Sequence, residues 1–98
     1  MAGSEEQQAV QHFTSVLKGE VSAEEIRSWP DWTSLVDVHR RNIAHILTIL
    51  GNSDLFLALL PEIPVAHFTV QDKESNTPID YLLRSGKDEE LLKLIELH

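Results

Sequence analysis

Residues 72–80 read Asp72-Lys73-Glu74-Ser75-Asn76-Thr77-Pro78-Ile79-Asp80, and Gly86 and the leucine-rich segment 91–95 follow them. The Thr77 hydroxyl can cap a helix that starts with Pro78, because proline presets the backbone angle of the first helical position and has no N–H to satisfy there. An apolar stripe then runs to Gly86, a residue that favours a helix C-terminus. The stretch predicts a helix over 78–85 and another that Asp88 opens.

The same order of an apolar stretch, a glycine and a helix-capping residue occurs twice more towards the N-terminus. Gly51 and Gly19 each end an apolar-periodic stretch, and each is followed within three residues by a residue suited to cap a new helix. The spacing predicts an all-α chain of six helices in three hairpins. The expected helices lie at about 4–18 (with a capping box at Ser4), 22–29, 43–50, 55–60, 78–85 and from Asp88 onward. Alternating apolar and polar residues over 66–71 predict one short extended piece.

The segment from Asp72 to Gly86, with Thr77-Pro78 at its centre, resembles the ankyrin repeat pattern. It departs from that pattern at Ser75, where the family has glycine, and at Asp80, where it has histidine. The resemblance implies one ankyrin-like domain over 1–98, a stack of about three helical hairpins. Residues 72–98 form its C-terminal repeat, 37–71 a second repeat with Asn42-Ile43 in place of Thr-Pro, and 4–36 a degenerate N-terminal helical unit.

Composition narrows the possible functions. The 98 residues carry a formal charge of −8 and no cysteine. A chain this acidic repels a phosphate backbone, so a nucleic acid is not an expected partner. The lack of cysteine excludes disulfides and thiolate sites and favours an intracellular, cytoplasmic location. No apolar run approaches the ~20 residues that a membrane-spanning helix needs, and the first residues do not read as a secretory signal.

The histidines do not indicate a reactive centre. Asp37 and His39 stand near His45, but the first two are expected on a loop, while His45 occupies the place of the family's structural histidine. No nucleophile elbow and no phosphate-binding glycine loop occurs in the sequence. We therefore expect no enzyme, no metal and no cofactor.

The resemblance implies a protein-protein interaction module, a scaffold or adaptor that binds through its finger loops and concave helix face. Ankyrin-like proteins share no enzymatic activity. The acidic surface favours a partner with a basic region, while His39-Arg40-Arg41 is a basic cluster that could meet an acidic one. The candidate partner-binding residues are Trp29, Trp32, His39, Arg40, Arg41, Ile46, Ile49, Lys73 and Tyr81.

Three other interpretations stay open. The chain could be a regulatory or capping segment excised from a larger multidomain protein. It could be a small helical enzyme that uses His39 and Asp37. It could also be an adaptor bundle of six helices without stacked repeats.

Overall fold

The computed structural model describes residues 2–97, with side chains from Gln7 onward. This part of the chain is all-α: it holds six α-helices and two short 3-10 helices and no strand. The elements are α1 (Ala2–Leu17), α2 (Ala23–Ser28), α3 (Ile43–Leu50), α4 (Ser53–Leu59), η1 (Leu60–Glu62), η2 (Val65–Thr69), α5 (Pro78–Ser85) and α6 (Asp88–Leu97). The all-α prediction is confirmed.

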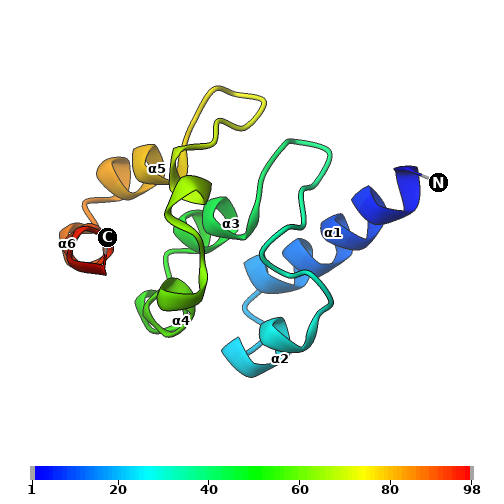
Figure 1. Ribbon diagram of the computed structural model, residues 1–98, viewed down its shortest axis with the longest axis horizontal. Helices are drawn as coiled ribbons and strands as arrows, with labels where there is room; N and C mark the ends of the chain where they lie inside the picture. The colour runs from blue at the N-terminus through cyan, green and yellow to red at the C-terminus, as the bar shows by residue number, and fades with distance from the viewer. Residues whose placement is uncertain (1, 98) are drawn as a thin grey trace.

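The helices follow one another from one end of the molecule to the other. Helix α3 packs against α1 on one side and α5 on the other, and α4 lies between α2 and α6. Figure 1 shows this progression, with α1 and α6 at opposite ends of the longest dimension, which measures 39 Å. Two long loops, one before α3 and one before α5, project from the same side.

Capping residues explain the limits of α3 and α5, which are the first helices of the second and third hairpins. Asn42 accepts the N–H of His45 at the start of α3, and Thr77 accepts the N–H of Asp80 at the start of α5. The side chains of His45 and Asp80 accept the cap N–H groups in return, so both ends are capping boxes. The helices stop where Gly51 and Gly86 adopt left-handed backbone conformations.

One apolar core runs through the molecule because every hairpin contributes large buried side chains. Phe13 comes from α1, Ile26 from α2, Phe56 from α4 and Phe68 from η2. The rings of Phe56 and Phe68 meet edge to face, with centroids 6.1 Å apart. Helix α3 lies in the middle of the core, and its residues 43–48 are all buried. This agrees with the nearly uniform apolar character of that helix.

The prediction of an extended piece over 66–71 is wrong. Residues 65–69 form η2, in which the N–H of His67 donates to the carbonyl of Pro64 over 3.0 Å. The turn brings Phe68 into the core and leaves Val70 exposed, so these two residues do not share a face. The free energy gained by burying one large aromatic side chain decides the conformation of this segment, whereas a weak alternation over six residues does not.

The other helix ends differ by small amounts from the predicted ones. Helix α1 begins at Ala2, so Ser4 lies within the helix rather than before it. The capping box predicted at Ser4 depends on the Ser4 side chain, which lies outside the described side chains. Asp88 is the first residue of α6 rather than the residue that precedes it. Since Asp88 still lies in the first helical turn, its charge favours the positive end of the helix as expected.

Candidate functional site

The two projecting loops end in turns that the carboxylates of Asp37 and Asp72 hold. In the first finger, residues 37–41, Oδ1 of Asp37 accepts the N–H groups of His39 and Arg41, each over 2.9 Å. The backbone N–H of Asp37 donates to the carbonyl of Arg41 over 3.0 Å and closes the turn. The buried carboxylate thus replaces the hydrogen bonds that a short loop lacks.

The second finger, residues 72–76, has the same set of hydrogen bonds 35 residues further along. Oδ1 of Asp72 accepts the N–H groups of Glu74 and Asn76 over 2.9 and 3.0 Å, and its own N–H donates to the carbonyl of Asn76 over 2.9 Å. The fourth residue of each turn is left-handed, with φ of 60° at Arg40 and 65° at Ser75. The turn therefore keeps one geometry although neither position is glycine.

The second oxygen of each carboxylate has a different partner. Oδ2 of Asp37 pairs with the guanidinium of Arg41 at 2.8 Å, whereas Oδ2 of Asp72 accepts the Tyr81 hydroxyl at 2.5 Å. Burial raises the pKa of Asp72, but the hydrogen bonds that its carboxylate accepts from Tyr81, Asn76 and Glu74 together lower the pKa by more. The pKa of Asp72 therefore lies below its ordinary value. Burial and the neighbouring carboxylate raise the pKa of Tyr81. Arg41 thus holds the first finger from within it, and Tyr81, on α5, holds the second finger.

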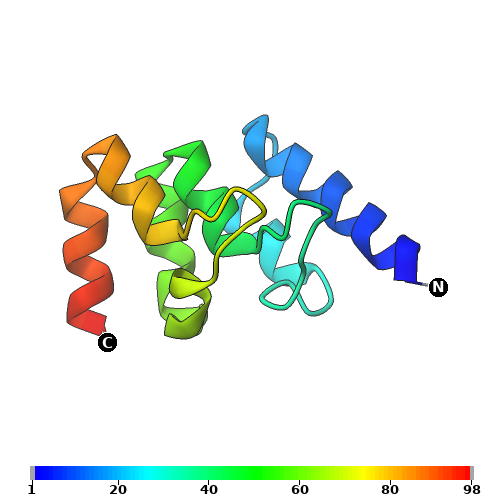
Figure 2. The same ribbon diagram turned by 90° about the horizontal axis from the view of Figure 1, so that it is seen from above.

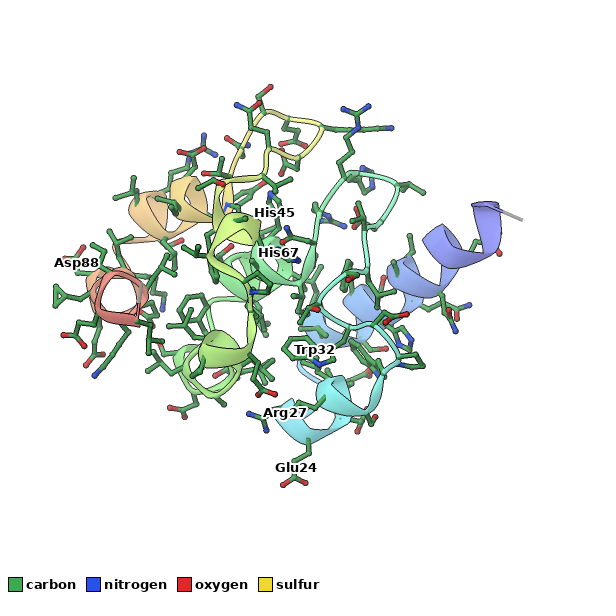
Figure 3. All side chains as sticks on the ribbon, in the orientation of Figure 1. Glu24, Arg27, Trp32, His45, His67 and Asp88 are labelled. Atoms are coloured by element: carbon green, nitrogen blue, oxygen red, sulfur yellow. The ribbon has the colours of Figure 1, made fainter. Side chains whose placement is uncertain are left out.

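The two fingers are joined to each other and to α3. The N–H of Lys73 donates to the carbonyl of His39 over 2.9 Å, and Figure 2 shows the two loops next to each other. Behind them, Nδ1 of buried His45 accepts the N–H of Asn42, which leaves Nε2–H to donate to the carbonyl of Asn76 at 3.1 Å. Burial lowers the pKa of His45 despite that hydrogen bond. Figure 3 shows His45 below the second loop.

The joined fingers present a surface of apolar and basic side chains, here called the finger surface. It consists of Val36, Val38, His39, Arg40 and Lys73, all of which are exposed. Val36 and Val38 are 48% and 42% exposed, although apolar side chains are usually turned inward. Among the described side chains, Arg40 and Lys73 form no ion pair.

An open groove of about 1120 Å³ runs along this surface. Its lining comes from three parts of the chain: Gln8 of α1, residues 30, 31, 34–38 and 40 of the first loop, and Lys73 of the second finger. A smaller hollow of about 200 Å³ lies between the fingers and includes His39, Arg41 and Lys73 together with Asp72 and Glu74. The groove thus brings apolar, basic and acidic groups of separate segments together.

The structure separates the predicted partner-binding residues into three groups, which lie at the fingertips, at the two tryptophans and on α3. His39, Arg40 and Lys73 lie together at the exposed fingertips, next to half-buried Arg41 and Tyr81. Trp29 and Trp32 are half-buried against the core, and the ring of Trp29 stacks on His12 with centroids 4.0 Å apart. Figure 3 shows Trp32 close to the body of the molecule, below the first loop.

The prediction that Ile46 contacts a partner is wrong, because its side chain is fully buried in the core. Helix α1 packs directly against α3, so the apolar face of α3 is covered rather than open to solvent. Ile49, one turn later, is partly exposed. The exposed part of α3 is therefore less apolar than the sequence predicts.

Sequence reasoning missed the apolar part of the finger surface. Val36 and Val38 stand on either side of Asp37, and the alternation Val-Asp-Val was visible in the sequence. The buried side chain is the aspartate and the exposed ones are the valines, the reverse of the usual order. Recognition of Asp37 as the residue that holds the turn could have identified the two valines as outward-facing.

The environment of Asp37 bears on the interpretation as a helical enzyme. Its carboxylate accepts hydrogen bonds from the His39 N–H, the Arg41 N–H and the Arg41 side chain. Among the described side chains, none of the hydrogen bonds that it accepts comes from the His39 ring. Within the described residues, no cluster of three histidine or carboxylate side chains has the arrangement of a metal site.

None of the helices of residues 2–97 combines the length and the apolarity needed to cross a membrane.

Comparisons with protein-family models, with curated proteins and with solved structures find no match to this chain.

Proposed function

We propose that the chain is an ankyrin-like protein-binding module that holds a segment of a partner protein against its finger surface. The observation that carries the proposal is the hydrogen bond from Lys73 N–H to the carbonyl of His39. It joins two turns that already have the same internal hydrogen bonds. The exposed side chains of both loops therefore belong to one preorganised surface, which loses little conformational entropy when a partner binds.

The chemistry of the finger surface indicates the kind of segment that it binds. Val36 and Val38 offer exposed apolar area beside an open groove, and Arg40 and Lys73 offer two cations. A segment with apolar residues and one or more carboxylates complements these groups. The net charge of −8 on the whole chain favours a basic region elsewhere in the same partner, which would accelerate encounter at low salt.

Charge reversal at the fingertips tests the proposal. Partners captured from an extract of the source cells by the unchanged chain would be compared with those captured by Arg40→Glu and Lys73→Glu variants. We expect each variant to reduce capture at least ~10-fold, since like charges across an interface are unfavourable. Lys93→Glu is the matched control, because Lys93 is an exposed lysine on α6, at the far end of the molecule.

The comparison requires that all variants stay folded, which circular dichroism can establish. If Lys73→Glu and Lys93→Glu capture the same proteins in the same amounts, the finger surface is not the binding site and the proposal fails.

A further inference from the structure

The last hairpin, α5–α6, has an unusually apolar outer face. Leu83 on α5 is 60% exposed and Ile95 on α6 is 67% exposed, and Leu92 and Leu97 of α6 are exposed as well. At the opposite end of the molecule, the exposed side chains of α1 and α2 are mostly polar, as Gln7, Gln11 and Glu24 illustrate. The two ends thus differ, and only one has the polar outer face that the terminal unit of a helical stack needs in water.

The preceding hairpin shows what such a face contacts. Because α5–α6 follows α3–α4 with a displacement of 35 residues, Leu83 corresponds to Thr48 and Ile95 to Leu60. Thr48 and Leu60 are both buried. Thr48 and Phe56 line the junction with the next hairpin, opposite Leu82 and Glu90. Two of the four exposed positions, those of Leu83 and Ile95, are therefore buried one hairpin earlier. Leu57, which corresponds to Leu92, is half-buried, and Glu62, which corresponds to Leu97, is exposed.

Polar groups at the same junction define the charge that a partner should bring. Nζ of Lys87 donates to the carbonyl of Gly51 over 3.2 Å, and Ser53 Oγ donates to the carboxylate of Glu90. One unit later, Gly86 takes the place of Gly51, and Asp88 takes the place of Ser53. A carbonyl and a carboxylate at these positions call for basic groups in the facing unit.

We propose that the outer face of α5–α6 is a docking surface for one further helical hairpin, packed as α5–α6 packs on α3–α4. This hairpin carries an apolar inner face, a lysine that reaches the Gly86 carbonyl, and a second basic residue that pairs with Asp88. The proposal continues an interface that the molecule already contains. The proposal does not depend on the finger surface, which lies on the loops before α3 and before α5.

The probe for this test is a copy of residues 63–97 joined directly after Leu97, so that the displacement of 35 residues is kept. In the copy, the residue that corresponds to Glu90 is changed to lysine, which brings the second basic group to Asp88. We expect the extended chain to unfold in one transition whose midpoint rises by about 5 °C or more, since nearest-neighbour interfaces stabilise stacked units. We also expect amide hydrogens of residues 83–97 to exchange more slowly.

Two variants make the test specific. A copy that keeps glutamate at the position corresponding to Glu90 should give a smaller rise, because two carboxylates then face each other. Ile95→Glu in the original α6 should leave the unextended chain's midpoint unchanged, since that side chain is exposed, but it should remove the rise in the extended chain. An appended copy that remains unfolded, with no slower exchange at residues 83–97, would overturn the proposal. So would a symmetric dimer of the unextended chain that Ile95→Glu dissociates, because the occupant would then be a second copy.

Discussion

His45 shows how one buried side chain can connect three parts of the fold. Its Nδ1 caps the start of α3, its Nε2 holds the second finger through Asn76, and its ring meets Tyr81 edge to face with centroids 6.2 Å apart. Only the neutral ring with hydrogen on Nε2 satisfies both hydrogen bonds. Protonation would place a second hydrogen on Nδ1, against the N–H of Asn42, in a site where burial already disfavours charge.

The stability of the protein should therefore fall in mild acid. The unfolded chain protonates His45 near pH 6.5, while the folded chain does so only at lower pH. The unfolded state then binds more protons, so the contribution of His45 is complete above pH 6.5 and decreases as the pH falls towards the folded pKa. The expected decrease is at most about 1.4 kcal/mol per pH unit.

Urea unfolding at pH 7.5 and pH 5.5 measures this effect. The His45→Gln variant is the control, because glutamine does not titrate while the other histidines remain. We expect a smaller difference between the two pH values in the variant than in the unchanged chain. Equal differences would show that His45 is not held in its neutral form.

At the scale of single elements, capping residues determined how much of the fold could be predicted. Helices at 43–50 and 78–85 have the predicted limits because a capping side chain precedes each and a glycine follows it. The limits of η2 could not be predicted, since they depend on a tertiary contact between Phe68 and Phe56. Ile46 was misplaced because α3 is apolar nearly all round, so its sequence does not distinguish a surface face from a core face.

The finger turns provide a prediction about backbone strain. Ser75 occupies the left-handed region at φ 65°, which is unfavourable for a residue with a Cβ atom by about 1–2 kcal/mol. Replacement by glycine removes that strain but adds freedom to the unfolded chain, worth about 0.4–1 kcal/mol. We expect Ser75→Gly to raise the free energy of unfolding by about 0.5 kcal/mol, as the difference between these two effects.

The matched control for this substitution is Ser85→Gly. Ser85 is the last residue of helix α5, where glycine has no strain to relieve and should be destabilising by up to about 1 kcal/mol. Opposite signs for the two variants in urea unfolding support the account of the turn. A loss of stability in both would contradict it.

At the scale of the whole molecule, the candidate site depends on how separate segments come together. The basic cluster at His39 to Arg41 was visible in the sequence, but its junction with Lys73 depends on the stacking of α3 and α5. The groove also needs Gln8 of α1, which no local pattern connects with the first loop. Charge and loop position could thus be predicted from the sequence, whereas the shape of the finger surface could not.

The most direct test of the central claim is site-specific photo-crosslinking in the source cells. A photoreactive amino acid would replace Val38 on the finger surface in one variant and Glu24 on α2 in another. Both positions are exposed, and Figure 3 shows Glu24 on the opposite side of the molecule from the loops. We predict a discrete crosslinked partner from position 38 that position 24 does not give. Crosslinks of the same partner from both positions, or from position 24 alone, would contradict binding at the finger surface.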